Sequence, residues 1–236
     1  NENVTLIKHA EKLNSFRDLD KILKTQSSKK GQPLSHYIHF ATTGKTPPRK
    51  EYTSTGNFLI KVGNLTGSGI NWEARDRNFI SDEELEKRLK GKKPIVLEEG
   101  DILLTSSAHS PIYIGKKSDI FTGKPEFLKS GEISLVGEVM LIRVKKELVS
   151  PYLILSYLKD PETINEVQSM VRGQTAHLHS SDLERLIIPD EIFENNSPHQ
   201  RVAKILKRES EINQEKSELV NHRNTILSES TNFEKT

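Results

Sequence analysis

The hydrophobic pattern is most regular near the C-terminal end of the chain. Ile205, Ile212, Leu219 and Ile226 lie seven residues apart in a stretch that contains no Gly or Pro. This spacing predicts one long helix with an apolar stripe along one side. Ser197 and Pro198 are typical of an N-cap and a first helical residue, and Gln200 completes a capping box. We therefore expect a helix over 197–229, roughly 48 Å long, and a short tail over 230–236.

The stripe of this predicted helix is incomplete as a coiled-coil seam. The second apolar position of each heptad holds polar residues, such as Arg208 and Glu209. A strict two-stranded coiled coil is therefore not predicted. Two interpretations remain, a helix that seeks a partner and a terminal helix that packs on its own domain. The length of the rod favours the partner-seeking role.

Between residues 33 and 190, short apolar runs alternate with helix-start signals. The stretches at 57–62 and 101–105 predict strands. The stretch at 138–145 contains a continuous apolar run, which is typical of a central strand covered on both faces. Ser81 with Glu84 predicts a capped helix start, and Ser150-Pro151 and Asp160-Pro161 predict two more. Residues 173–179 are predicted as a loop, Ser181 as a further cap, and 186–189 as an edge strand. The pattern predicts a mixed α/β domain, with a twisted sheet and flanking short helices.

The first 32 residues follow a different pattern. Residues 3–24 have apolar positions at helical spacing, and residues 25–32 form a polar stretch. We expect a helical extension and linker over 1–32, attached to the domain over 33–190. No internal repeat is present, so the chain holds one such domain and one long helix.

Composition excludes several classes of protein. Hydrophobic residues make up 33% and charged residues 29% of 236 residues, and the net charge of +2 is too small to indicate nucleic acid by itself. No cysteine is present, which excludes disulfides and thiolate metal sites and fits the cytoplasm. No apolar run approaches the roughly 20 residues of a membrane span, and there is no signal peptide. The chain begins with Asn1, which is compatible with a piece of a longer protein.

Two local clusters suggest chemistry, and neither has the required spacing. Gly44-Lys45-Thr46 resembles the end of a phosphate-binding P-loop, but His39 stands where that motif has its first Gly. His177 and His179 precede Ser180 to Asp182, where the Ser and Asp are expected to cap a helix and no third metal ligand is near. We predict no catalytic residue, no metal site and no cofactor on this chain.

Six short motifs occur in a specific order along the chain. They are Thr-Gly-Lys-Thr-Pro-Pro (43–48), Phe-Leu-Ile-Lys-Val (58–62), Gly-Asp-Ile-Leu-Leu (100–104), Gly-Gln-Thr (173–175), Leu-Ile-Ile-Pro (186–189) and the helix-opening Gln200. Together they resemble the target-recognition domain of the specificity subunit of type I restriction–modification enzymes. The chain departs from that family at Ala108 and His109, where a Gly is usual, and at His199, where a Glu is usual.

The resemblance implies a division of labour. The domain would read one half of an interrupted double-stranded DNA site, and the long helix would act as a spacer against a second helix and dock DNA methyltransferase subunits. Catalysis, S-adenosylmethionine binding and the restriction endonuclease or translocase would belong to partners. A complete specificity subunit has two domains and two helices, so the chain is expected to be a half-subunit that forms a homodimer, a fragment, or the recognition tail of a fused methyltransferase. The rival interpretation is a protein–protein assembly adaptor that reads no DNA sequence.

DNA reading needs donors and acceptors on loops that enter the major groove, and cations for the phosphates. The candidate loops are 43–50, 64–77, 106–117 and 172–179. The base-reading candidates are Asn64, Arg75, Arg77, His109, Gln174 and His177. The phosphate candidates are Lys45, Arg49, Lys61, Lys116, Lys117 and Arg172. The helix-interface candidates are Ile205, Ile212, Leu219 and Ile226.

Overall fold

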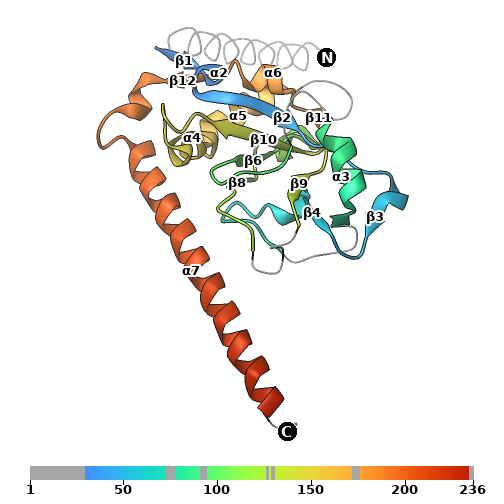
Figure 1. The fold of residues 1–236 in the computed structure, drawn as a ribbon. Helices are drawn as coiled ribbons and strands as arrows, with labels where there is room; N and C mark the ends of the chain where they lie inside the picture. The colour runs from blue at the N-terminus through green and yellow to red at the C-terminus, as the bar shows by residue number, and fades with distance from the viewer. Residues whose placement is uncertain are drawn as a thin grey trace, which may run out of the picture.

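The computed structural model describes residues 30–72, 78–90, 95–125, 128, 131–171 and 176–233, without the side chains of residues 221 and 228–233. Figure 1 shows a layered domain from which one long helix projects. The helical extension predicted over 3–24 and most of the linker lie outside the described residues. So do four DNA-reading candidates, which are Arg75, Arg77, Arg172 and Gln174.

A four-stranded antiparallel sheet forms the centre of the domain. Its order is β2 (Ile38–Thr43), β10 (Val139–Val144), β6 (Ile102–Thr105) and β8 (Ser118–Ile120). Strand β10 lies between β2 and β6, as its continuous apolar run predicts. Along it, Met140 and Ile142 face one hydrophobic core while Val139 and Leu141 face another, because successive side chains of a strand point to opposite faces.

Helices cover the first face of this sheet. They are α2 (Leu34–Tyr37), α4 (Pro151–Leu158), α5 (Pro161–Ser169) and α6 (Ser180–Leu183). The two predicted proline starts are confirmed at α4 and α5. The Asp160 carboxylate caps α5 by accepting hydrogen bonds from the N–H groups of Glu162 at 2.9 Å and Thr163 at 3.4 Å. The predicted cap at Ser181 is wrong by two residues, because His179 is the N-cap of α6 and Ser181 lies inside it.

A second sheet covers the other face. Its order is β3 (Tyr52–Thr53), β5 (Phe79–Ile80), β4 (Asn57–Ile60) and β9 (Ile133–Leu135), with β4 and β9 parallel. Helix α3 (Asp82–Leu89) adds Leu85 to this core, and the Ser81 hydroxyl caps it at the Glu84 N–H, as predicted. Aromatic rings fill the core, with Phe58 against Trp72 and Phe79. The predicted mixed α/β class is confirmed, with two four-stranded sheets that share a core in place of one sheet.

Two pairs of very short strands complete the domain. Strand β1 (Gly31–Pro33) pairs with β12 (Ile187–Pro189), so residues 31 and 32 are not linker, and the predicted edge strand is confirmed. Strand β7 (Ser107–Ala108) pairs with β11 (Ala176–His177), so two segments predicted as loops are paired instead. The connections include four 3-10 helices, η1 (Arg49–Glu51), η2 (Val62–Asn64), η3 (Pro111–Tyr113) and η5 (Asp190–Phe193).

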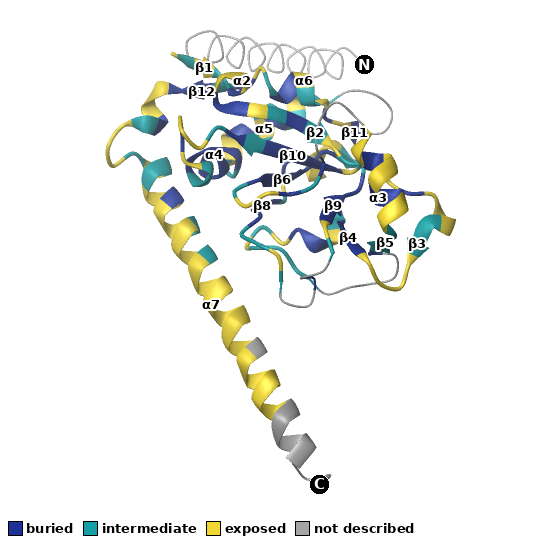
Figure 2. Cartoon of the chain, viewed as in Figure 1, coloured by how far each residue is buried: buried dark blue, intermediate teal, exposed yellow. Residues whose placement is uncertain are grey.

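Helix α7 (Pro198–Phe233) is the predicted C-terminal rod. The Ser197 hydroxyl accepts a hydrogen bond from the Gln200 N–H at 3.2 Å, as an N-cap does. Ala203 and Leu206 pack on the core that contains α4, and the helix beyond them runs away from the domain (Figures 1 and 2). The four predicted interface residues are exposed, at 58% for Ile205, 47% for Ile212, 69% for Leu219 and 51% for Ile226. The domain therefore does not bury the apolar stripe.

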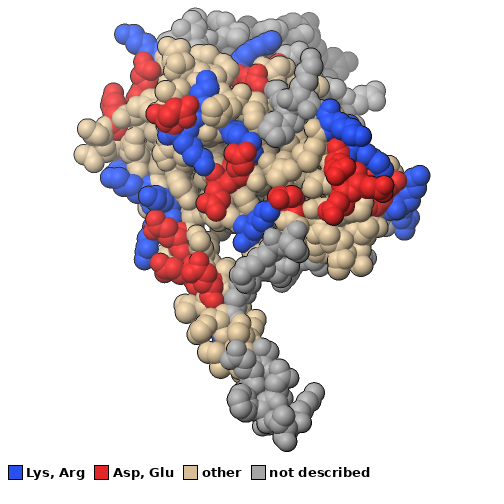
Figure 3. All heavy atoms as spheres, viewed as in Figure 1, with Lys and Arg blue, Asp and Glu red and all other residues tan. Residues whose placement is uncertain are grey.

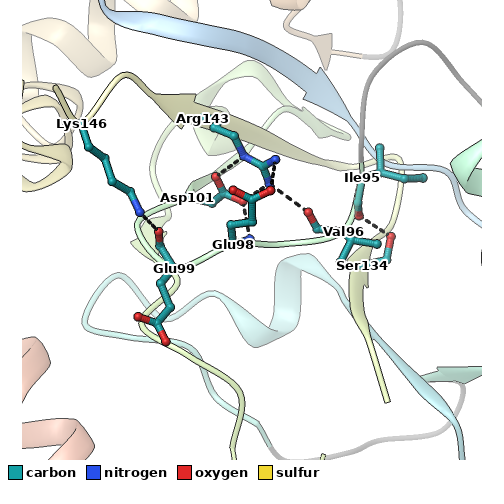
Figure 4. Close-up of polar contacts among 8 residues, drawn as sticks. All are labelled: Ile95, Val96, Glu98, Glu99, Asp101, Ser134, Arg143 and Lys146. Carbon is teal, nitrogen blue, oxygen red and sulfur yellow. Dashed lines mark hydrogen bonds and ion pairs between the residues drawn. The ribbon is translucent and has the colours of Figure 1, made fainter. Parts of the chain in front are cut away.

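A buried ion cluster fixes the segment that leads into β6 (Figure 4). The Arg143 guanidinium donates to both carboxylate oxygens of Asp101, at 2.9 and 2.8 Å, and to Glu98 at 2.6 Å. It also donates to the Val96 carbonyl at 2.9 Å, and its face lies over the Phe40 ring. The hydrogen bonds to Asp101 raise the pKa of Arg143 above its usual value.

Candidate nucleic-acid interface

One edge of the central sheet carries two of the four predicted DNA-reading loops. Strand pairing places the ends of β2 and β6 beside the starts of β8 and β10, since Thr43 pairs with Met140, Val139 with Thr105, and Leu104 with Ser118. The loop over 43–50 follows β2, and the segment over 106–117 joins β6 to β8. Strand β11 reaches the same edge through its pairing with β7. The antiparallel topology thus gathers segments that are far apart in sequence.

Backbone hydrogen bonds hold these segments against one another. The Gly44 N–H donates to the Val139 carbonyl at 3.2 Å, and the Lys45 N–H donates to the Leu135 carbonyl at 3.3 Å. Only glycine fits at position 44, because a Cβ there would lie 2.0 Å from the Leu135 oxygen. The Ser106 N–H donates to the Glu138 carbonyl at 3.0 Å, and the Leu178 N–H donates to the Ser106 carbonyl at 2.9 Å.

Side chains reinforce this junction at Thr46. Its hydroxyl donates to the Glu138 carboxylate at 2.8 Å and accepts from the Gly137 N–H at 3.0 Å. The buried Arg88 of α3 donates to the Lys45 carbonyl and pairs with Glu84 at 3.2 Å. Contacts from the β9–β10 connection and from α3 therefore hold the loop that carries Lys45 in place.

The described phosphate candidates differ in exposure. Lys45, Arg49 and Lys116 are exposed, and Lys117 and Lys61 are half-buried. Lys45 and Lys117 adjoin the sheet edge, while Lys61 follows β4 of the second sheet with its amine 5.2 Å from the centre of the Tyr52 ring. The sheet edge thus gathers only some of these cations.

The two described histidine candidates are exposed near this edge. The His109 ring lies 4.9 Å from the Tyr113 ring, and Nδ1 of His177 lies 2.5 Å from the Ser107 hydroxyl oxygen. The Gln168 side chain holds the loop below them by donating to the carbonyls of Ile112 and Ile114, each at 3.0 Å. Both rings are accessible to a ligand at the edge.

Asn64, the remaining described base-reading candidate, is used inside its own loop. Its side chain is buried, with the residue 6% exposed. Its carbonyl oxygen accepts from the Lys61 N–H at 2.9 Å and from the Asn78 side chain at 3.3 Å. Its amide nitrogen donates to the Asn71 carbonyl at 2.8 Å. Asn64 therefore stabilises its own loop, and the proposed DNA contacts do not include it.

Sequence reasoning missed four residues at this edge. Ile112 and Tyr113 are 58% and 41% exposed although they are large and apolar. Glu138 falls at the start of a predicted strand, and no sequence pattern distinguishes Ser107. The apolar residues between Pro111 and Gly115 were the sequence signal that could have indicated this exposed apolar surface. The roles of Ser107 and Glu138 depend on tertiary contacts and leave no local signal.

Charge does not form a single basic face on the side of the molecule drawn in Figure 3. Lys and Arg side chains alternate there with Asp and Glu side chains over the domain. The positive groups at the sheet edge must therefore act locally, over a distance of about 10 Å or less in physiological salt.

A cleft of about 650 Å³ separates the loop over 66–71 from helix α7. Asp119 holds this loop by accepting from the N–H groups of Thr66 at 2.8 Å, Gly67 at 3.0 Å and Gly69 at 2.8 Å. The Lys159 amine donates to the Gly67 carbonyl at 2.6 Å, and the Asn213 side chain donates to the Ser68 carbonyl at 3.4 Å. The loop thus links helices α4 and α7.

Lys159 should make stability depend on pH. Burial lowers the pKa of its amine below 10.5, although Asp119 and Glu209 oppose the shift. Because the folded chain releases this proton at a lower pH than the unfolded chain, the free energy of unfolding should rise with pH between the lowered pKa and about 10.5. Urea denaturation at stepped pH should show a flatter profile for Lys159→Met over this interval. Parallel profiles for the two proteins would contradict this assignment.

The described part of the chain holds neither a candidate metal site nor a candidate membrane span. No group of three or more His, Asp or Glu side chains there could hold a metal ion. No helix there is long and apolar enough to cross a membrane.

Comparisons with known proteins identify similar solved structures. No protein-family model and no curated protein matches the chain. A chain from a structural study of the assembly and conformational transition of the type I R-M system matches with a TM-score of 0.48 and 15% identity, covering 94% of this chain and 51% of that one. The HsdS subunit from Thermoanaerobacter tengcongensis matches with a TM-score of 0.46 and 13% identity, covering 92% and 49%. The type IIG restriction endonuclease BpuSI matches with a TM-score of 0.50 and 12% identity, covering 81% and 28%.

The likeness is one of fold. The match to BpuSI shows that the mixed α/β architecture described above also occurs in part of that enzyme. The chain spans about half the length of the first two of these chains and a smaller share of BpuSI.

Proposed function

We propose that this chain recognises one half of an interrupted double-stranded DNA site for a type I restriction–modification or related adenine methyltransferase complex. The sheet edge that carries Lys45, His109, Lys117 and His177 would enter the major groove. Helix α7 would dock methyltransferase subunits or a second copy of the chain. Methyl transfer with S-adenosylmethionine, and DNA cleavage or translocation, would belong to the methyltransferase and endonuclease subunits.

The convergence of segments at one sheet edge is the observation that carries this proposal. Cations that can contact phosphates lie there beside rings that can hydrogen-bond to bases, on loops held by backbone contacts. This is the combination that DNA reading requires, since phosphate contacts set the register and base contacts give the specificity. The order of the sequence motifs and the fold shared with part of a restriction endonuclease also support the proposal.

The exposed stripe on α7 supports the docking role. Isolated exposed apolar residues are common, but a row of large ones along a helix that leaves its domain is typical of an interaction surface. Ile205, Ile212, Leu219 and Ile226 form the row, with Val220 and Leu227 beside it. The helix that docks there would bury this row.

Arg49→Ala should weaken DNA binding about equally on all sequences. Arg49 is exposed on η1, where a phosphate contact would release a counterion on binding. Loss of that contact should reduce the slope of log affinity against log salt by about one unit. Titration of matched and unmatched duplexes at several salt concentrations measures this slope.

Lys145→Ala is the charge control for this measurement, with circular dichroism to check its folding because the Lys145 amine donates to the His36 carbonyl at 2.9 Å. It removes one positive charge at the end of β10 opposite to the proposed interface. The control should keep the slope of the unaltered chain. Equal slopes for all three proteins would remove Arg49 from the interface.

Selection from a random duplex pool tests the function itself. The full chain, alone and with a type I methyltransferase subunit, should retain duplexes that share a sequence. Retention of the methyltransferase without any selected sequence would instead favour the assembly adaptor.

A further inference from the structure

Ser107 and His177 form a directly opposed side-chain pair at the sheet edge. They are register partners in the pairing of β7 with β11. The Ser107 hydroxyl oxygen lies 2.5 Å from Nδ1 of His177. Ser107 is half-buried and His177 is exposed, so the ring is the more accessible member of the pair. The contact therefore acts on one ring nitrogen and leaves the other for an outside partner.

This contact bears on the position of the proton on the neutral ring. A neutral imidazole has one N–H donor and one bare acceptor nitrogen, and the partner of one nitrogen selects the role of the other. A hydroxyl can donate to a bare Nδ1 or accept from an Nδ1–H. The separation of 2.5 Å is shorter than the roughly 2.7–3.2 Å usual for an N–H donor and lies at the short end of the range for an O–H donor, which favours Ser107 as the donor. The ring hydrogen then lies on Nε2, at the nitrogen farther from Ser107.

We infer that Ser107 holds His177 as the Nε2–H tautomer, and that His177 thereby reads a hydrogen-bond acceptor on a base edge. This inference rests on the proposed DNA-reading function and assigns the chemistry of one contact in it. In the major groove, guanine offers N7 and O6, adenine offers N7, and thymine offers O4, whereas cytosine offers only a donor. The base that faces His177 is therefore guanine, adenine or thymine, and cytosine is rejected because two donors would meet.

Ser107 is a positioning residue in this scheme. It contacts Nδ1 and sets which hydrogen-bonding role Nε2 presents. Removal of its hydroxyl should change base preference without removing the group that touches the base. Ser107→Thr keeps a hydroxyl and should preserve the preference, while Ser107→Ala should weaken it.

Nitrogen NMR tests the tautomer without DNA. In long-range ¹H–¹⁵N spectra of the full chain, recorded where the ring is neutral, His177 should show a protonated Nε2 and a bare Nδ1. Ser107→Thr should keep this pattern, and Ser107→Ala should give averaged nitrogen shifts. A protonated Nδ1 in the unaltered chain would overturn the inference.

Modified DNA tests the base contact. A duplex selected by the full chain is scanned with 7-deazapurines, which lack N7, and with base-pair substitutions. At one position the unaltered chain should lose about tenfold in affinity when the acceptor is removed. His177→Ala should lose this discrimination and bind both duplexes alike, and Ser107→Ala should retain only part of it. His179→Ala, which removes an exposed imidazole two residues away, should behave as the unaltered chain.

Failure of this inference differs from failure of the proposed function. If the chain selects a sequence but His177→Ala discriminates as well as the unaltered chain, the histidine contact is wrong and DNA reading remains. If the chain selects no sequence, the proposed function and the base contact both fail.

Discussion

Arg143→Ala should lower the free energy of unfolding by about 3–5 kcal/mol. The side chain of Asp101 is 2% exposed and that of Arg143 is 11% exposed, so truncation leaves a carboxylate buried without its cation. The variant also loses the hydrogen bonds that hold Val96 and Glu98. Because these contacts fix the segment before β6, the loss should extend to the sheet. Urea denaturation followed by circular dichroism measures the change.

A paired substitution separates the charge effect from the packing effect. Arg143→Met combined with Asp101→Asn removes both charges. In the unaltered chain the Glu98 N–H donates to the Asp101 carboxylate at 2.8 Å, and the side-chain oxygen of Asn can still accept this hydrogen bond. This double variant should recover part of the stability lost in Arg143→Ala. If Arg143→Ala unfolds at the same urea concentration as the unaltered chain, the cluster contributes nothing to stability.

Ile212→Lys combined with Leu219→Lys should weaken any association through α7 by about a hundredfold or more. Burial of one large aliphatic side chain contributes about 1.5–3 kcal/mol, and two lost contacts correspond to at least two powers of ten in affinity. The variant also places like charges in the contact. Sedimentation measures self-association, and retention of a methyltransferase subunit on the immobilised chain measures docking.

Glu211→Lys combined with Glu218→Lys is the control for this experiment. These two exposed residues are also seven apart, but lie about 100° around the helix from the stripe. The two Glu→Lys substitutions change the net charge more than the test variant does. If the control still associates, a change in net charge is excluded as the cause of the loss in the test variant. If the test variant associates normally, the stripe is not an interface.

Local signals predicted the parts of the fold that depend on local interactions. Helix α7 followed from heptad spacing and its cap at Ser197, and α4 and α5 followed from their prolines. The central position of β10 followed from its unbroken apolar run. Each of these signals lies within one short stretch of sequence.

The parts of the fold that the sequence did not predict depend on contacts between segments that are far apart in the chain. The β7–β11 and β1–β12 pairs join segments of two or three residues that are too short for a periodic pattern. The second sheet depends on a parallel pairing of β4 with β9 across more than 70 residues, between Phe58 and Ile133. The site shared this difficulty, because the internal role of Asn64 and the contact of Ser107 with His177 arise only after folding.

The sheet edge is held by main-chain contacts, and this has an evolutionary consequence. Gly44, Lys45, Ser106 and Leu178 are fixed through their N–H groups, which every residue except proline possesses. Outward-pointing side chains such as Lys45 and His109 are therefore freer to change than the backbone beneath them. New ligand preferences could arise by substitution at these positions, one at a time, on an inherited scaffold.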